Sequence, residues 1–272
     1  MEDIKLVLAD IDGTLLNDAL QVTERTRKAI NSLATQGIMF GIATGRSPYA
    51  VIRLVKEWGI AEATRYIVGF NGCGTMDTKT QEMYFFHMLS GEGIARLLDD
   101  FQGFHFNAGI YDKEEYHAIM ADEIAEKTAR ANHFKLVVDD LSHYIKTGAA
   151  KVLVTAPKAE MDHIVAYYET LLPREYHAFR SGDVRLECVN PNLTKSKGIA
   201  ALCERLGITL GQVLTFGDMM NDYEMIRDCT GVAMGNADTR IKEVAKYITT
   251  DNNNDGIGVF LEDHILGQNM RI

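Results

Sequence analysis

The sequence contains little cysteine. Its 272 residues include 4 cysteines, and no two of Cys73, Cys188, Cys203 and Cys229 are close enough in the chain to form a C-x-x-C pair. This excludes the usual sequence signatures of a structural zinc site or a dithiol redox centre. Isolated cysteines in a chain of this length are typical of reduced core residues, which predicts a cytoplasmic protein.

The chain also lacks long hydrophobic runs and an excess of positive charge. The apolar run Ile4–Ala9 stops at Asp10 and is too short for the core of a signal peptide, and no apolar stretch approaches a membrane span. The formal net charge of -10 argues against nucleic-acid or anionic-membrane partners, since both require a basic surface. If the substrate is an anion, a metal ion and a few cationic side chains must offset the protein's negative charge at the binding site.

Several common enzyme motifs are missing as well. The sequence has no G-x-G-x-x-G, no G-x-x-x-x-G-K and no G-x-S-x-G string. The nearest approach to the first is Gly72-Cys73-Gly74, where Asp77 stands in place of the third glycine. The usual dinucleotide, P-loop and serine-hydrolase signatures are therefore absent.

The N-terminal part of the chain alternates between predicted strands and helices. Ile4–Ala9 is nearly continuously apolar, as in a strand buried on both faces. Capping signals then predict a helix over Thr23–Gln36, ended by Gly37. The pattern continues with a strand over Ile38–Ala43, a helix from Ser47-Pro48 to Gly59, and a strand over Tyr66–Phe70. This order predicts a parallel sheet with right-handed crossovers.

The same alternation returns near the C-terminus. Predicted helices lie around Ile199–Leu206, Tyr223–Asp228 and Thr239–Ala245, and predicted strands over Val213–Phe216, Gly231–Met234 and Tyr247–Thr249. These elements extend the N-terminal sheet. We therefore expect an α/β fold with a Rossmann-like, mostly parallel sheet and helices on both of its faces.

The middle of the chain has longer and more polar predicted strands. They cover His105–Tyr111, Lys151–Thr155 and Phe179–Val189, and predicted helices cover Gly93–Phe101, Asp122–His133 and Glu160–Leu172. This pattern favours an α+β unit with an antiparallel sheet. We expect residues 85–184 to form an inserted cap domain that sets substrate specificity, and residues 1–84 and 185–272 to form the catalytic core.

Four short segments carry the candidate chemistry, and the sequence predicts each at the carboxyl end of a strand, where open α/β sheets bind ligands. The first is Asp10-Ile11-Asp12-Gly13-Thr14. One carboxylate can attack phosphorus, and a second one nearby can protonate the leaving oxygen and then activate water. A calcium loop is excluded, because Leu15 and Gln21 occupy its glycine and glutamate positions. A plain acidic turn is the alternative.

The second segment is Thr44-Gly45-Arg46, which follows the second predicted strand. A hydroxyl and backbone N–H groups before a helix can hold phosphoryl oxygens, and Arg46 adds positive charge. Ordinary turn chemistry is the alternative at this position.

The third segment contains Lys195, with Lys197 as its rival. A lysine at the start of a helix is unfavourable for the helix itself. Pairing with a phosphate or a carboxylate would explain it, and a solvated lysine is the alternative.

The fourth segment, Gly217–Asp222, follows the strand Val213–Phe216. Asp218 can bind a hard cation, and Asn221 and Asp222 could orient the site; an ordinary helix cap is the alternative. Asp10, Asp12, Asp218 and Asp222 would meet at one sheet edge and repel each other without a cation. Mg²⁺ is the expected cofactor, because it prefers oxygen ligands and works with substrate phosphates.

The ordered segments resemble the haloacid dehalogenase (HAD) superfamily of phosphatases, and in particular the Cof-like sugar-phosphate phosphatases with a large α/β cap (type IIB). The resemblance covers nearly the whole chain and includes the strings Asn71-Gly72, Gly235-Asn236-Ala237 and Asp255-Gly256. The family usually has a lysine followed by glycine, which here is Lys197-Gly198. Lys195 is favoured nevertheless, because it keeps the family's spacing to Leu206-Gly207-Ile208.

The resemblance implies a role for each matching residue. Asp10 would be the nucleophile and a metal ligand, and Asp12 the general acid/base and a metal ligand through its carbonyl oxygen. Lys195 would neutralise charge on the phosphoryl group and on Asp10. The remaining expected roles are phosphoryl binding by Thr44, phosphate or substrate binding by Gly45, Arg46, Asn71 and Asn221, and metal binding by Asp218 and Asp222.

The expected function is Mg²⁺-dependent hydrolysis of a small organic phosphate, such as a sugar phosphate, through an aspartyl-phosphate. A phosphotransferase or phosphomutase with the same intermediate is the main alternative. A non-catalytic phosphate-binding protein is disfavoured, because it would not need both Asp10 and Asp12. The expected partner is thus a small-molecule phosphate.

Overall fold

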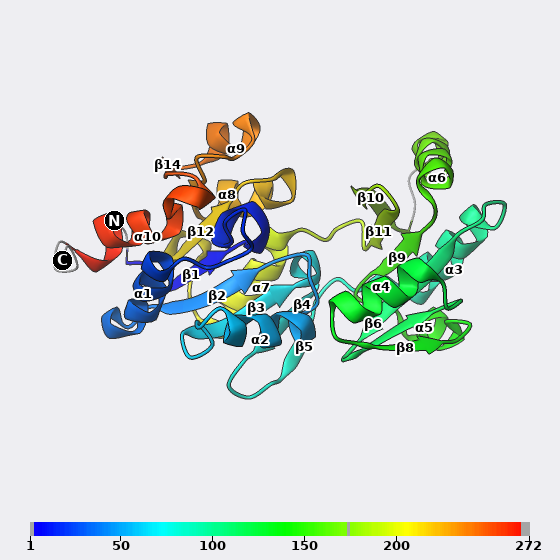
Figure 1. The fold of residues 1–272 in the computed structure, drawn as a ribbon, viewed down its shortest axis with the longest axis horizontal. Coiled ribbons are helices and arrows are strands. Elements are labelled where there is room, and N and C mark those ends of the chain that lie inside the picture. Colours follow the sequence, from blue (N-terminus) through cyan, green and yellow to red (C-terminus); the bar gives the residue numbers. More distant parts are fainter. Residues whose placement is uncertain (1–2, 173–174, 268–272) are drawn as a thin grey trace. The chain divides into compact units, whose positions relative to one another are not determined.

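The computed structural model describes residues 3–172 and 175–267 (Figure 1). These residues form two compact units. Unit 1 contains the residues up to Phe86 and those from Thr194 onward, and unit 2 contains His87–Leu193. Each unit has its own sheet and its own apolar core.

Unit 1 is built on an 8-stranded sheet in the order β14-β13-β12-β1-β2-β3-β4-β5. The six strands from β14 to β3 pair in parallel, which confirms the predicted α/β fold class. The last two strands, β4 and β5, pair antiparallel and were not predicted. The strand bounds are β1 Leu6–Ala9, β2 Met39–Ala43, β3 Thr64–Gly69, β4 Gly74–Asp77, β5 Met83–Phe85, β12 Val213–Gly217, β13 Thr230–Ala233 and β14 Tyr247–Ile248.

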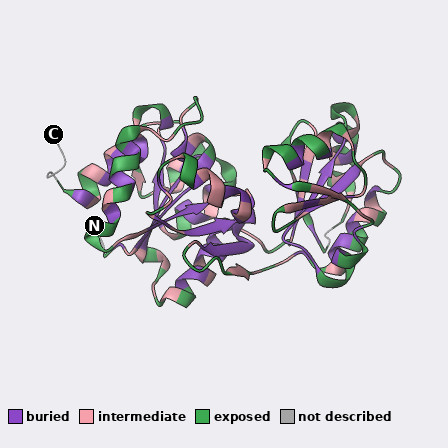
Figure 2. Ribbon diagram, turned by 60° about the horizontal axis from the view of Figure 1, so that its bottom comes forward, coloured by how far each residue is buried: buried purple, intermediate pink, exposed green. Residues whose placement is uncertain are grey.

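The helices of unit 1 begin and end largely at the residues that the capping signals indicate. The Thr23 side chain accepts a hydrogen bond from the amide of Thr26, and Gly37 has the left-handed conformation that ends this segment. The helices are α1 Glu24–Ser32, α2 Pro48–Glu57, α7 Lys195–Leu206, α8 Tyr223–Asp228, α9 Thr239–Val244 and α10 Gly256–Leu261. Strands β1 and β12 are buried along their whole length, so both faces of the sheet centre are covered (Figure 2).

Unit 2 has a 6-stranded sheet in the order β10-β11-β9-β6-β7-β8. All neighbours pair antiparallel except β7 and β8. Its strands are β6 Asn107–Asp112, β7 Glu115–Ala118, β8 Lys135–Val138, β9 Val152–Thr155, β10 His177–Gly182 and β11 Arg185–Val189. Its helices are α3 Gly91–Phe101, α4 Glu123–Ala131, α5 Ser142–Thr147 and α6 Lys158–Thr170.

One strand prediction in this unit is wrong. The single strand expected over Phe179–Val189 is a hairpin, in which β10 and β11 are joined at Asp183-Val184. Gly182 and Asp183 are typical turn residues, and this local signal outweighs the β-forming residues on either side.

Among the described residues, no helix is both long enough and apolar enough to cross a membrane.

Candidate active site

The loop after β1 brings Asp10 to the carboxyl edge of the parallel sheet. The amide of Asp10 donates to the carbonyl of Phe216 on β12 at 3.0 Å, which extends the ladder between the two strands. Gly13 has a φ of 77°, and a Cβ there would lie 2.5 Å from Oδ2 of Asp218. The glycine is therefore needed both for the left-handed turn and for the close approach of Asp218.

Three carboxylates from separate segments meet at this edge. Asp10 follows β1, Asp218 follows β12, and Asp222 ends the short 3₁₀ turn Met220–Asp222. All three are buried, and one ligand atom from each lies within 4.8 Å of the others. The structure therefore brings together three of the four carboxylates that the sequence analysis expected here.

Lys195 joins two of these carboxylates. Its Nζ lies 2.5 Å from Oδ1 of Asp10 and 2.6 Å from Oδ1 of Asp222, and the residue is 1% exposed. The side chain of Lys197 is exposed, and its amide donates to the Thr194 hydroxyl as part of the helix cap. The geometry thus gives Lys195, rather than Lys197, the contact with the carboxylates.

Lys195 does not follow a strand of the core sheet, so its predicted placement at a strand end is wrong. It is the first residue of α7, and Gly198 lets that helix pack closely on the loop after β3. A Cβ on Gly198 would lie 2.3 Å from the carbonyl oxygen of Gly72, and one on Gly72 would lie 2.4 Å from that of Thr194. The two glycines therefore permit the backbone contact that carries Lys195 to the site.

The charged groups of the cluster shift one another's pKa values. Burial raises the pKa of Asp10 to about 7; Lys195 opposes this rise, while Asp222 and Asp218 add to it. Burial likewise raises the pKa of Asp218 to about 6, and the hydrogen bond that Thr14 donates opposes this rise. Burial alone would lower the pKa of Lys195, but Asp10 and Asp222 raise it overall, so the ammonium stays charged. Three buried carboxylates share one ammonium, which favours an additional cation.

The oxygens of the cluster are not equally available. Oδ1 of Asp222 accepts from Lys195, and its Oδ2 accepts from the amides of Asp218 at 3.0 Å and Met219 at 3.3 Å. Oδ1 of Asp10 accepts from Lys195, and Oδ1 of Asp218 accepts from the Thr14 hydroxyl at 2.7 Å. Within the described part of the chain, Oδ2 of Asp10 and Oδ2 of Asp218 have no hydrogen-bond donor. These two oxygens suit a hard cation such as Mg²⁺.

Asp12 lies apart from the buried cluster. Its carboxylate accepts two hydrogen bonds from Arg46, from Nη2 at 2.6 Å and from Nε at 3.1 Å, and both side chains are partly exposed. This pairing joins the first predicted segment to the second. It also holds the Asp12 carboxylate at the exposed side of the loop, where it can meet a solute.

The second segment lies between the loops that follow β1 and β3. Thr44 is buried; its carbonyl accepts from the amide of Asn71, and its hydroxyl accepts from the amide of Arg46. A Cβ on Gly45 would lie 3.0 Å from Oδ1 of Asn71, so these two residues are adjacent. Asn71 has a φ of 56°, which fits a residue held by its surroundings.

Asn221 is exposed in the 3₁₀ turn, beside Asp222 but outside the buried cluster. The sequence analysis assigned no role to two residues that support the site. Thr14 donates to Asp218, and Asn236 donates to the carbonyl of Gly13 at 2.8 Å. Both occur in strings that were quoted, Asp10–Thr14 and Gly235-Asn236-Ala237, but their spacing alone did not indicate these long-range contacts.

Comparisons with known proteins show what the whole chain is similar to. The profile of a family described as haloacid dehalogenase-like hydrolase matches residues 7–261. The Bacillus subtilis 5-amino-6-(5-phospho-D-ribitylamino)uracil phosphatase YitU is 26% identical, over 95% of this chain and 97% of its own. The crystal structure of a haloacid dehalogenase-like hydrolase from Bacteroides thetaiotaomicron superposes with a TM-score of 0.83 at 28% identity, covering 95% of this chain and 98% of its own.

A further solved structure supports the fold. The HAD subclass IIB sugar phosphatase BT4131 superposes with a TM-score of 0.75 at 22% identity, covering 94% of this chain and 96% of its own. The match extends over both units, so the likeness includes the inserted α+β part as well as the parallel sheet.

Proposed function

The chain belongs to the haloacid dehalogenase-like hydrolase family and is a phosphatase, and from this premise we propose that it hydrolyses small organic phosphomonoesters, sugar phosphates in particular, with Mg²⁺ and Asp10 as the covalent nucleophile. The observation that carries the proposal is the buried contact of Lys195 with Asp10, with Asp218 next to it. It combines a nucleophile, a fixed positive charge and free carboxylate oxygens in one place.

In the first step, a carboxylate oxygen of Asp10 attacks phosphorus. A P–O bond to Asp10 forms, the P–O bond to the leaving group breaks, and the leaving oxygen takes the electron pair and a proton from Asp12. Lys195 holds the Asp10 side chain in place and offsets the charge that gathers on the phosphoryl oxygens. Thr44, Gly45 and Asn71 supply hydrogen-bonding groups around these oxygens.

In the second step, Asp12 acts as a base. It removes a proton from water, the water oxygen forms a bond to phosphorus, and the bond between phosphorus and Asp10 breaks. The products are inorganic phosphate and the original Asp10 carboxylate. Arg46 donates two hydrogen bonds to Asp12, so this pair must separate before Asp12 can donate a proton to the leaving oxygen.

The residues present fit Mg²⁺. Oδ2 of Asp10, Oδ2 of Asp218 and the carbonyl of Asp12 would hold it, while Asp222 fixes Lys195 and the backbone of the Asp218 loop. When bound there, Mg²⁺ would supply positive charge that offsets the charge on the phosphoryl oxygens.

The test is phosphate release from p-nitrophenyl phosphate and from a panel of sugar phosphates, with and without Mg²⁺. Release that requires Mg²⁺ is expected, and no release from any phosphate would contradict the proposal. A phosphotransferase or phosphomutase would differ, because its turnover would depend on an added acceptor and yield a new phosphorylated product.

We predict that Mg²⁺ stabilises the folded protein. The cation relieves repulsion among the buried carboxylates. Because Mg²⁺ would bind only the folded state, a Mg²⁺ concentration one hundred times Kd should stabilise that state by ~2.7 kcal/mol. Melting curves recorded across a Mg²⁺ titration measure this shift. The Asp218→Asn variant should lose the Mg²⁺-dependent shift, whereas Asp99→Asn, at an exposed residue of α3, should keep it. If Mg²⁺ shifted the melting curve of Asp218→Asn as much as that of the wild type, Mg²⁺ binding at this cluster would be contradicted.

We also predict that the inserted segment, expected over residues 85–184, sets specificity without taking part in the chemistry. The residues of unit 1 on either side of the insertion meet at one turn: the amide of Phe86 donates to the carbonyl of Cys73 at 2.7 Å, and Thr194 lies against Gly72. A short linker can therefore replace His87–Leu193.

The shortened protein should keep measurable Mg²⁺-dependent activity on p-nitrophenyl phosphate and lose most of its preference among natural phosphates. Circular dichroism and gel filtration must first show that it folds. A folded core with the full-length ranking of substrates would show that the segment does not set specificity.

A further inference from the structure

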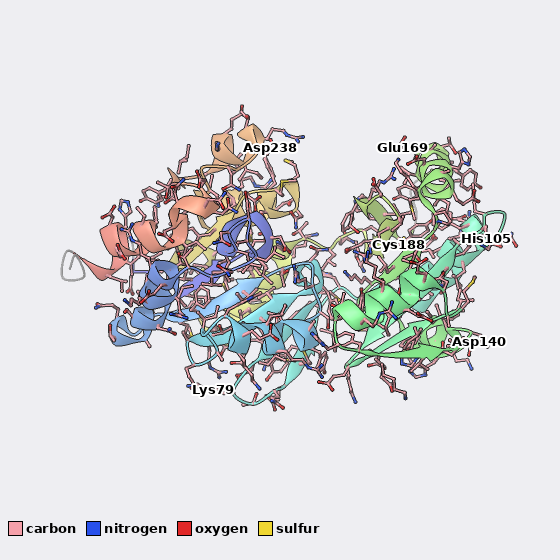
Figure 3. The ribbon with its side chains drawn as sticks, viewed as in Figure 1. Lys79, His105, Asp140, Glu169, Cys188 and Asp238 are labelled. Atoms are coloured by element: carbon pink, nitrogen blue, oxygen red, sulfur yellow. The ribbon has the colours of Figure 1, made fainter. Side chains whose placement is uncertain are left out.

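One edge of the sheet in unit 2 has no neighbouring strand. Strand β8 is the last strand in the order β10-β11-β9-β6-β7-β8 (Figure 1). Asp140, which Figure 3 labels, lies two residues beyond the end of β8. A free edge presents a row of unpaired N–H and C=O groups, so it is a template on which another strand can pair.

Strand β8 differs from the other three edge strands of the described residues. Strands β14 and β5 have 2 and 3 residues, so each offers few backbone groups. The register of β10 against β11 shifts between Arg180 and Gly182, and such an irregularity blunts an edge. The 4 residues of β8 pair with β7 in an unbroken register, and Val138 is 54% exposed. Of these edges, β8 is therefore the one best able to accept a further strand.

The pairing with β7 determines which backbone groups of this strand point to the free edge. The amides of Lys135 and Asp139 donate to carbonyls of the β7 segment, at 3.0 and 3.1 Å. Because backbone groups on one side of a strand come from alternate residues, the amides and carbonyls of Leu136 and Val138 point away from β7. Within the described part of the chain, these two amides have no hydrogen-bond acceptor. Two residues thus offer both of their backbone groups to a partner.

The charged side chains at this edge favour one register. The Lys135 side chain is 73% exposed and pairs with Glu115 of β7 at 3.0 Å. The Asp139 side chain is 36% exposed and pairs with His117 of β7 at 2.6 Å. Lys135 and Asp139 are four residues apart, so they point to the same face of the sheet. If a second copy of the strand ran antiparallel beside the first, Lys135 of each copy could lie directly opposite Asp139 of the other, as favourable cross-strand pairs do.

We propose that β8 pairs antiparallel with β8 of a second copy of this chain, about a twofold axis at Val137. In this register Leu136 of each copy lies opposite Val138 of the other, and each such pair exchanges two backbone hydrogen bonds. A shift by one residue would bring groups that point to the edge opposite groups that point to β7. A shift by two residues would separate Lys135 from Asp139. A second copy is the fitting partner, because this edge supplies both charges of the pair and the backbone groups that complement its own.

Sedimentation equilibrium of the full-length protein, over a range of concentrations, measures the Kd of the dimer. The fraction of wild-type dimer should rise with concentration. Val138→Pro removes an amide that points to the free edge, where a monomer tolerates proline. The symmetry removes this hydrogen bond twice, so Kd should rise at least ~30-fold. Val138→Thr is the matched control, because it changes the exposed side chain but keeps the amide; its Kd should stay within ~5-fold of the wild-type value.

Introduced cysteines test the register. Val137→Cys places the two new thiols opposite each other at the twofold axis, within reach of a disulfide. Val138→Cys places them on a diagonal, too far apart for a disulfide, although Val138 is the more exposed residue. After mild oxidation, non-reducing electrophoresis should therefore show cross-linked dimer for Val137→Cys and much less for Val138→Cys. The wild type supplies the background from its own four cysteines.

Three outcomes would overturn the inference. The first is a wild type that stays monomeric at every concentration, which would leave this edge to a strand of another protein. The second is a dimer whose Kd is the same in a folded Val138→Pro protein, since its contact would lie elsewhere. The third is faster cross-linking of Val138→Cys than of Val137→Cys. Melting curves show whether Val138→Pro folds, and the cysteine variants test the pairing even if it does not. None of these measurements depends on phosphatase activity.

Discussion

Replacing Asp10 with asparagine is expected to lower kcat by at least ~10³, because it would impair both the proposed covalent catalysis and the proposed metal binding. An amide oxygen is a poor nucleophile towards phosphorus and a weaker ligand for Mg²⁺. The fold should survive, since the amide oxygen can still accept a hydrogen bond from Lys195. The change also removes one of three buried carboxylates, so repulsion with Asp218 and Asp222 falls.

The measurement is kcat for p-nitrophenyl phosphate at saturating Mg²⁺, with the melting temperature recorded for the same preparation. Asp99→Asn is the matched control, because it makes the same chemical change at an exposed residue. Mass spectrometry must exclude deamidation of the introduced asparagine back to aspartate. A near-normal rate in an intact Asp10→Asn protein would rule out the covalent mechanism.

The sequence predicts the parallel sheet of unit 1 because its signals are local. Ile4–Ala9 is apolar throughout and ends in a charged residue, and Val213–Phe216 repeats this pattern before Gly217 and Asp218. A buried strand that stops at a carboxylate indicates both the strand and the site at its end. Asp10 and Asp218 were predicted for this reason, and they lie next to each other because β1 pairs with β12.

The parts that were missed have either weak local signals or contacts far apart in the chain. Strands β4 and β5 are short and contain Gly74, Thr75 and Asp77, so their composition alone does not indicate a sheet edge. Lys195 itself was predicted, but the close packing of α7 on Gly72 that carries it to the site was not, because periodicity cannot show it. The separation of Asp12 from the buried carboxylates depends on Arg46, 34 residues further along the chain.

The second large effect is expected when Lys195, rather than its rival Lys197, is replaced. Lys195→Met leaves Asp10 and Asp222 buried without the ammonium that they share. Breaking a buried ion pair in this way typically costs about 3–5 kcal/mol. The free energy of unfolding should therefore fall by that amount. Loss of a positioned charge at the phosphoryl group should also lower kcat by at least ~10². Methionine is similar in length to lysine, which limits the packing defect.

Lys197→Met makes the same change two residues away, at an exposed side chain. Surface substitutions of this kind usually change stability by less than ~0.5 kcal/mol, and kcat should stay near the wild-type value. Urea unfolding and kcat for p-nitrophenyl phosphate, measured on both variants, decide between the two lysines. Because Mg²⁺ also offsets the carboxylate charge, it should restore part of the stability that Lys195→Met loses but little of its activity. If Lys197→Met lost activity while Lys195→Met kept it, the family's usual lysine–glycine string would mark the functional lysine, and the buried contact of Lys195 would be structural alone.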